Sequence, residues 1–499
     1  MVGEQQQPLL LPSNSTLNSN HGGFEGERKN EAFDVVGIAK ETCEELKKVW
    51  EIAGPSIFCR LAMFSLTIIT QSLAGHLSDL DLAAFSIVTT LLISISFGFL
   101  IGMASALETL CGQAYGAKQH QMLGIYLQRS FIVLFCCALL LLPMFIFAEP
   151  LLRILGQSAE VAARTGLVAR WLIPMHMSFV FQFSLLKFLQ CQLKTAVIAW
   201  SSAMALVVHA IISWVFVYKI GVGVVGTALT LGVSWWTSVF ILYGYVAWGG
   251  CPVTWNGFSW LAFSELWDFF KLAIATGIMF LLEHMYCRVL VIASGDTGNS
   301  KVELDALSVC VTAFGWESMV PLGIFTATGV RVAIELGAGN VKGAKFAAKV
   351  SLMISLVIGL AFSTLALAIP ERLAMIFTPN SSVIRVVHEL SPLLGVSILI
   401  NSIPPVLLGI AVGSGWQALG AYVNIGSYYL LGFPLGILIG WTLNFGYKGI
   451  WTGMLGGSVV QILLLTIIAL RHKWEKKVQN KSCISKFDVQ KARGNKEMD

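Results

Sequence analysis

Apolar stretches of about 20 residues recur along the chain, from near Glu51 to near Leu470, with short polar segments between them. A helix needs about 20 mostly apolar residues to cross the hydrocarbon core of a bilayer. The pattern predicts twelve spanning helices, at 51–73, 82–105, 126–148, 165–187, 195–218, 224–247, 270–294, 306–330, 347–369, 387–412, 416–440 and 448–470. We therefore expect an all-α polytopic membrane protein.

The predicted helices form two groups of six. The stretch between them, 249–269, is polar and aromatic, and we interpret it as a linker between two six-helix lobes, 45–248 and 270–472. A polar tail, 1–44, precedes the first lobe and is predicted to be disordered. A basic cytoplasmic tail, 473–499, follows the second lobe.

A weak internal repeat relates the two groups, with corresponding residues 221 to 223 positions apart. Transporter folds are often built by such duplication. The matching residues are Gly102 with Gly323, Gly116 with Gly337, Leu82–Ile87 with Leu304–Val309, and Gly223–Gly226 with Gly446–Gly449. Because each unit has an even number of spans, the lobes should share one orientation and be related by an axis along the membrane normal. The cavity between them is the expected substrate site.

The composition agrees with this interpretation. Hydrophobic residues make up 56% of the chain and charged residues 12%, and the mean hydropathy is +0.74. Soluble globular proteins lie well outside these values, so that class is excluded. The net charge of +5 is modest, and nucleic acid is not an expected partner.

Basic residues predict the orientation, because cytoplasmic loops of membrane proteins are enriched in Lys and Arg. A basic run follows the last span directly and places the C-terminus in the cytoplasm: Arg471, Lys473, Lys476 and Lys477. An even number of spans then places the N-terminus there too. Connections on that side carry Lys118, Lys187, Lys194, Lys342, Lys345 and Lys349, whereas the opposite connections carry Arg153, Lys301 and Arg372.

The N-terminal tail contains no apolar run like that of a signal peptide, so cleavage is not expected. Its segment Glu4–Leu10 places an acid before two leucines and resembles a sorting signal for the vacuolar membrane. The sequence leaves the vacuolar membrane and the plasma membrane open as locations.

Two carboxylates lie in the middle of predicted spans, Glu283 in 270–294 and Glu317 in 306–330. Charge at bilayer depth costs several kcal/mol, so such residues are functional candidates by default. Burial disfavours the charged form of a carboxyl group, which could then exchange a proton near physiological pH. The charged form would attract a cationic substrate and the protonated form would release it, so that proton and substrate would compete for one site.

The alternative interpretation is a structural ion pair, in which Arg288 neutralises Glu283 or Glu317. Residues five apart on one helix do not face each other well, which weakens the pairing of Arg288 with Glu283. Both interpretations remain open for the two acids.

The repeat offers a second possible charge partner. Alignment through Gly54 and Gly277 places Arg60 opposite Glu283, so that one half carries a cation where the other carries an acid. The N-terminal spans, bounded as above, contain no central carboxylate. Proton coupling is then expected in the C-terminal lobe alone, although a single gap in the alignment would remove the correspondence.

Asn401 lies in the tenth predicted span, shortly before Pro404 and Pro405. Proline in a spanning helix frees backbone groups that need other partners. The expected kink could bind substrate through exposed carbonyls, or it could be only a break in packing.

Several conspicuous residues are predicted to lie at helix ends and to act as structural joints or gates rather than as binding residues. Glycine at such ends permits the left-handed conformation that stops a helix. These residues are Glu108, Gly112, Gly116, Arg331, Glu335, Gly337 and Gly339.

Other classes of chemistry find no support in the sequence. The chain contains no GxxxxGK[ST] phosphate loop and no HExxH zinc motif. Its ten cysteines form no CxxC pair and are interpreted as small packing residues. Neither ATP-driven pumping, nor a metal or other cofactor, nor an enzymatic reaction is therefore expected.

Three motifs together are similar to those of a known family: Ala106–Lys118, Arg331–Asn340 and Gly413–Gln417. The chain resembles the multidrug and toxic compound extrusion (MATE) family, in its plant detoxification-carrier branch, over roughly Glu45 to Trp474. The resemblance implies two six-helix lobes, alternating access, and antiport of organic cations or secondary metabolites against protons or sodium. Protons are usual in the plant branch.

The resemblance also assigns residues. The family's seventh-helix acid falls on Glu283, in agreement with the choice made from hydropathy. Its tenth-helix aspartate, present in part of the family, falls on Asn401, so one proton carrier is missing and Glu283, assisted by Glu317, must do more. The first-helix aspartate of many bacterial relatives has no counterpart here.

The predicted function is a proton antiporter that exports an amphipathic organic solute from the cytosol and uses the proton gradient as its energy source in membrane lipid. The sequence leaves the oligomeric state open and favours a monomer. A major-facilitator-type carrier is one alternative, but its D-R-x-G-R motif is replaced by Gly116–His120. A gradient-independent channel or flippase is another, and a membrane enzyme is a third.

Overall fold

The computed structural model describes residues 22–295, 301–472 and 474, and the described residues form helices joined by short connections. The chain divides into two compact units, Met1–Lys47 and Lys48–Asp499. Helix α1 (Gly22–Leu77) passes from the first unit into the second. The segment Glu4–Leu10 and the basic residues Lys473, Lys476 and Lys477 lie outside the described residues.

Helix α1 begins inside the tail that is predicted to be disordered. Residues 22–44 include several Glu, Lys and Ala residues, which favour helices even where the sequence is polar. The low hydropathy of this stretch shows only that it is not a span. The structure describes a helix from Gly22 onwards, and disorder of the tail stays a prediction.

The helices of the second unit follow one another with few long connections. After α1, the N-terminal half contains α2 (Asp79–Ile87), η1 (Val88–Ile93), α3 (Ser94–Gly116), α4 (His120–Ile146), α5 (Ala148–Ile154), α6 (Ala159–Trp171), α7 (Ile173–Cys191), α8 (Thr195–Trp214), η2 (Val215–Ile220), α9 (Val224–Tyr245), η3 (Val246–Gly250) and η4 (Trp260–Phe263). The C-terminal half contains α10 (Leu266–Gly295), α11 (Lys301–Gly337), α12 (Val341–Ala368), α13 (Pro370–Met375), α14 (Ser381–Asn401), α15 (Pro404–Ser414), α16 (Gln417–Asn424), η5 (Ile425–Gly432), α17 (Phe433–Ile437), η6 (Leu438–Thr442) and α18 (Gly446–Arg471).

Within the described residues, ten helices are long and apolar enough to cross a membrane, and the pair α6 and α7 would make an eleventh. The prediction of a polytopic helical membrane protein is thereby confirmed. The predicted span 270–294 lies on α10, which is not among those ten. Its described part carries Glu283 and His284, which lower its apolar character, so the number twelve stays a prediction.

Two of the predicted spans are broken. Span 165–187 consists of α6 and α7, which are bent by 44° where they meet at Leu172. Span 387–412 is divided between α14, which ends at Asn401, and α15, which begins at Pro404. Proline fits the first turn of a helix but cannot continue the preceding one, so the expected kink beside Asn401 is present.

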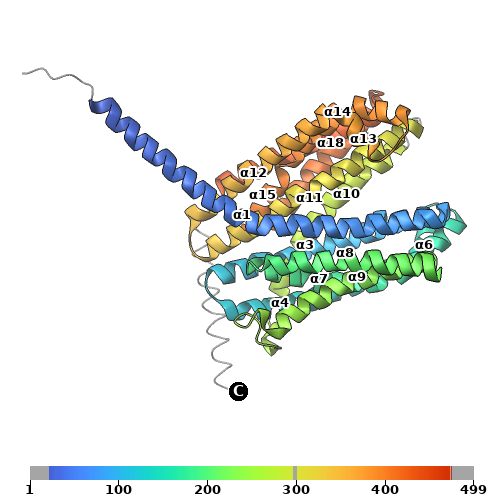
Figure 1. The fold of residues 1–499 in the computed structure, drawn as a ribbon, viewed down its shortest axis with the longest axis horizontal. Helices are drawn as coiled ribbons and strands as arrows, with labels where there is room; N and C mark the ends of the chain where they lie inside the picture. The colour runs from blue at the N-terminus through green and yellow to red at the C-terminus, as the bar shows by residue number, and fades with distance from the viewer. Residues whose placement is uncertain (1–21, 296–300, 473, 475–499) are drawn as a thin grey trace, which may run out of the picture. The chain divides into compact units, whose positions relative to one another are not determined.

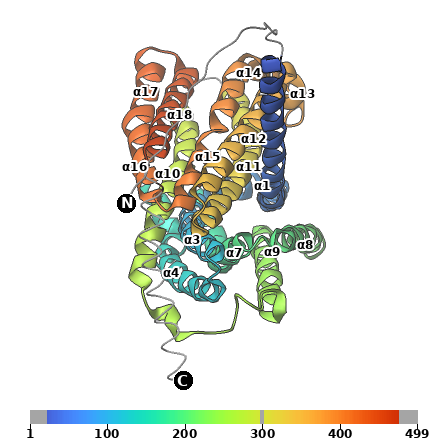
Figure 2. The ribbon, with the colours of Figure 1, turned by 90° about the vertical axis from the view of Figure 1, so that its left-hand side faces the viewer.

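The second unit contains two helical bundles, one formed by each half (Figure 1). Figure 2 shows α10, α11, α12, α14 and α18 of the C-terminal half on one side, and α3, α4, α7, α8 and α9 of the N-terminal half on the other. Hydrogen bonds join α1 to both bundles, from Gln190 to Ser56 and from Arg60 to Thr326.

Contacts between the bundles occur in pairs that the internal repeat relates to each other. A Cβ on Gly102 of α3 would lie 2.9 Å from Phe280 of α10, and a Cβ on Gly323 of α11 would meet Ile57 of α1. Each member of the first pair corresponds to a member of the second at the repeat spacing. Gly112 of α3 faces Ala333 of α11. Ala333 lies 221 positions later, so the two residues in contact correspond to each other in the repeat. The two halves are therefore related by a pseudo-twofold axis that passes where α3 meets α11.

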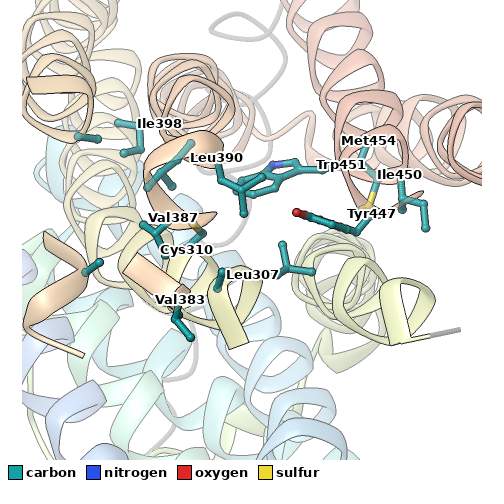
Figure 3. Close-up of a cluster of buried hydrophobic side chains, with 14 of the residues drawn as sticks. Leu307, Cys310, Val383, Val387, Leu390, Ile398, Tyr447, Ile450, Trp451 and Met454 are labelled. Carbon is teal, nitrogen blue, oxygen red and sulfur yellow. The ribbon is translucent and has the colours of Figure 1, made fainter. Parts of the chain in front are cut away.

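A cluster of buried apolar side chains lies inside the C-terminal bundle (Figure 3). Most of its side chains come from three helices: Leu307 and Cys310 of α11, Val383, Val387 and Leu390 of α14, and Tyr447, Ile450, Trp451 and Met454 of α18. In a lipid environment such close packing supplies the cohesion that water would supply in a soluble protein. Tyr286 of α10 belongs to the same cluster, so these helices pack against α10.

Candidate functional site

Glu283 lies on α10 beside the contact between the two halves. Its neighbour His284 approaches α3 so closely that a Cβ on Gly98 would lie 3.3 Å from His284 Cβ. Glu283 is partly exposed, and its Oε2 atom is buried without a hydrogen-bond partner among the described side chains. An acid so placed retains the capacity to bind a proton or a cation.

Glu317 forms a second acidic site on α11, together with Asn401. Only 7% of Glu317 is exposed, and neither carboxylate oxygen has a hydrogen-bond partner in the described part of the chain. The amide of Asn401 lies beside this carboxylate and donates to Ser318 Oγ over 3.3 Å. The structure therefore brings Asn401 together with Glu317.

Two arginines are the possible cationic partners of Glu283, and the structure describes the side chain of one of them, Arg60. The side chain of Arg288 lies outside the described residues. Arg60 donates to Thr326 Oγ1 of α11 over 3.3 Å, and the acid whose charge acts on it is Glu108. Within the described part of the chain, Arg60 forms no ion pair with Glu283, so correspondence in the repeat does not produce contact.

Glu108 and Lys187 form an ion pair that the sequence does not reveal. Both side chains are 0% exposed. Glu108 lies within α3, eight residues before its end, and Lys187 lies within α7. The placement of Glu108 at a helix end and of Lys187 in a connection is therefore wrong, and the expectation that the N-terminal spans contain no central carboxylate overlooked Glu108 within α3. Hydropathy fails here because each charge ends an apolar window, whereas in space each charge compensates the other.

Three of the four glycines predicted as joints lie at helix ends, and three of them stand where two helices approach closely. Gly339 has φ +78° and follows α11 in the left-handed conformation, as expected. Gly116 and Gly337 are the last residues of α3 and α11, as predicted, whereas Gly112 lies inside α3; at each of the three a Cβ would collide with the facing helix. Their absent side chains allow the two helices to approach each other.

Arg331 and Glu335 also lie within α11, near its end. Arg331 Nη2 and Glu335 Oε1 form an ion pair at 2.6 Å, and Glu335 Oε2 accepts from Asn340 at 2.9 Å. Asn340 in turn caps the start of α12 by accepting from the amide of Gly343 at 2.9 Å. This group joins α11 to α12, in agreement with the predicted structural role.

Aromatic side chains of the N-terminal half face α10 across the interface. Phe97 of α3 lies 5.9 Å from His284, between ring centroids, and 5.2 Å from Phe183 of α7. Trp235 of α9 packs edge-on against Phe97 at 6.4 Å. An acid on one half and aromatic rings on the other suit a flat, cationic, amphipathic molecule.

The sequence model of the family described as MatE matches residues 55–215 and 275–438, one range in each half. The chain belongs to the MATE family. It is therefore a membrane transporter of the secondary active efflux type, and the resemblance found from its motifs is confirmed.

Individual MATE relatives agree over nearly the whole chain. Protein DETOXIFICATION 27 of Arabidopsis thaliana is 50% identical over 450 residues, which cover 90% of this chain and 93% of the relative. The crystal structure of the eukaryotic MATE transporter AtDTX14 is 33% identical, with a TM-score of 0.84, and covers 88% of this chain and 98% of its own. A Vibrio cholerae MATE transporter, at 15% identity and a TM-score of 0.78, covers 87% of this chain and 99% of its own. This last likeness supports the fold alone.

Proposed function

We propose that this MATE transporter exports an amphipathic organic cation from the cytosol in exchange for protons, and that Glu283 couples the two movements. The observation that carries the proposal is the placement of Glu283. It is an acid in the middle of α10, after the apolar stretch 272–282, at the contact between the halves, and one of its oxygens is unpartnered among the described side chains. Intramembrane acids in such positions mark ion and substrate pathways.

The exchange follows from charge. The deprotonated form of Glu283 attracts a cation, while the ring of Phe97, beside His284, is the aromatic group of the other half that can stack on it. A proton that reaches Glu283 from the acidic side removes the negative charge and releases the cation. Since one carboxylate cannot hold both, proton and substrate compete and the proton gradient drives export.

Glu317 and Asn401 are assigned a supporting role. An amide at position 401 cannot gain or lose a proton in this pH range, whereas it can donate to a neighbouring oxygen. Its bond to Ser318 holds the end of α14 next to the turn of α11 that carries Glu317. In this proposal Glu317 is the second proton acceptor, and Asn401 orients it.

The proposal also includes the orientation of the chain, its membrane and its oligomeric state. Both termini face the cytoplasm, and the carrier works as a monomer in the vacuolar membrane or the plasma membrane. The positive-inside rule supports this orientation, and the segment Glu4–Leu10 supports the vacuolar membrane.

The test is uptake of a fluorescent organic cation into inside-out vesicles under a pH gradient, with the native protein and Glu283→Gln at equal abundance. We expect accumulation by the native protein only, and its loss when a protonophore is added. Glu389→Gln is the matched control, because Glu389 is 56% exposed on α14 and pairs with Lys448 at 3.6 Å. Equal activity of Glu283→Gln would move the coupling to Glu317, and uptake that survives the protonophore would favour a gradient-independent channel or flippase.

A further inference from the structure

Three charged side chains of the N-terminal half meet one short stretch of the C-terminal half. The ion pair between Glu108 and Lys187 is fully buried, and Arg60 is close enough for its charge to act on both. All three face α11 over Phe325–Gly329. This site belongs neither to Glu283 nor to Glu317.

The stretch of α11 that covers the ion pair carries no charge of its own. Lys187 Nζ lies 5.5 Å from the centre of the Phe325 ring, and Thr326 accepts the bond from Arg60. A Cβ on Gly329 would overlap Glu108 Oε1, an atom that has no hydrogen-bond partner among the described side chains. The C-terminal half thus excludes water from the pair without replacing the hydrogen bonds that water would make.

The repeat shows that the helix crossing itself does not need these charges. Gly329 lies 221 positions after Glu108, and Gly409 lies 222 positions after Lys187. In the C-terminal half these two glycines make the equivalent crossing of α11 and α15, where a Cβ on Gly409 would lie 3.4 Å from the Gly329 amide nitrogen. A charged pair and a glycine pair therefore support the same packing, so the charged pair has a further role.

That role follows from the cost of drying an ion pair. Removing two charges from water costs several kcal/mol for each ion, and their mutual attraction often fails to repay it. If α11 moves away from α3, water reaches Glu108 and Lys187 and the cost is recovered. Burial of the pair therefore limits how stable the closed contact between the halves can become.

We propose that Glu108 and Lys187 are positioning residues of the transport cycle: as an ion pair dried by Phe325–Gly329, they keep closure of the two halves on this side reversible. The inference rests on the proposed function only in that transport requires the halves to separate. Lys118 lies in the connection after α3, and Lys342 lies in the first turn of α12, directly after the connection that follows α11, so this side is the predicted cytoplasmic one.

The first test replaces both charges by apolar side chains of similar size, Glu108→Met with Lys187→Met. Buried ion pairs replaced in this way are often as stable or more stable, and the net charge of the group is unchanged. We expect slower hydrogen–deuterium exchange over 105–116 and 326–337, and a roughly tenfold fall in the uptake rate because the closed state is favoured. An unchanged exchange pattern together with native uptake would overturn the proposal.

The second test acts from the opposite half. Gly329→Ala introduces a Cβ against Glu108 Oε1, so exchange over both segments should rise, whereas Gly315→Ala on the same helix meets only Phe64, at 4.0 Å, and should change nothing. Glu108→Ala with Lys187→Met removes the collision, and adding Gly329→Ala to that pair should then have little further effect. Additive effects would overturn the proposal. Since exchange needs no gradient, failure of proton coupling in the native protein would leave this result interpretable.

Discussion

Tyr429 and Asn424 hold the turn of α10 that carries Glu283. Tyr429 Oη donates to the Leu282 carbonyl over 2.9 Å, and Asn424 Nδ2 donates to the Met279 carbonyl over 3.2 Å. In an α-helix the Met279 carbonyl also accepts from the amide of Glu283 itself. Gln461 of α18 orients Asn424 by donating to its Oδ1 over 2.8 Å. Side chains of α16, η5 and α18 therefore hold the turn that carries Glu283 in place.

Replacing Tyr429 by Phe should loosen this turn. Loss of one neutral hydrogen bond is expected to lower the free energy of unfolding by about 1 kcal/mol and to slow uptake through Glu283. The control is Tyr422→Phe, because Tyr422 is 71% exposed. Melting in detergent and uptake in vesicles measure both effects. Native uptake by Tyr429→Phe would show that the bond supports the fold without positioning Glu283.

The ion pair between Glu108 and Lys187 predicts that a single substitution destabilises the protein more than the double substitution. Lys187→Met alone leaves a buried carboxylate beside an apolar side chain. This change should lower the free energy of unfolding by about 3–5 kcal/mol. The added change Glu108→Met should restore most of that stability. The comparison of the two melting temperatures checks this, and equal destabilisation by both variants would contradict a strong pairing of these two residues.

Single residues could be predicted from the sequence where their signal is local. Glu283 and Glu317 stand out because each is an isolated acid inside an apolar window. Glu108 and Lys187 are 79 positions apart, and each limits the apolar window it lies in. Only the tertiary structure places one beside the other, so hydropathy counts them as span ends.

At the scale of helices, α3 and α11 depend on glycine for their close approach. A Cβ on Gly116 would collide with the Ile334 carbonyl, and one on Gly337 with the Gln113 carbonyl. Because the obstacle is backbone, no rotamer can relieve it, and Gly116→Ala should destabilise the protein by about 1–3 kcal/mol. Gly426→Ala is the control, since nothing lies within 4 Å of its Cβ position. Equal melting temperatures for the two variants would contradict the close contact.

Helices were predictable as apolar segments, but their breaks were only partly so. The prolines at the start of α15 indicate the break after Asn401. Near Leu172 the local signal is Pro174, in the first turn of α7, but composition alone predicts 165–187 as one span. The direction of each helix after a break depends on its packing partners, which the sequence does not show.

At the scale of the whole transporter, the internal repeat predicted how the halves would be related, because duplicated units tend to pack about an axis. The repeat places Gly102 beside Phe280 and Gly323 beside Ile57 by the same rule. It also showed that Arg60 corresponds to Glu283. It did not show that Glu108 and Lys187, whose counterparts are Gly329 and Gly409, would form an ion pair. The shared framework is symmetric, whereas the chemistry is not.

Transport by alternating access requires α3 and α10 to move relative to each other, and a covalent bond between them should stop it. The Cβ positions at Gly98 and His284 lie 3.3 Å apart, near the separation of about 3.5–4.5 Å found in disulfides. In Gly98→Cys with His284→Cys, oxidation should therefore abolish uptake and a reductant should restore it. Each single variant, treated alike, controls for the ten native cysteines and for the loss of His284. If the oxidised double variant forms the bond and still transports, then α3 and α10 move as one body, and the moving contact must be the one between α3 and α11.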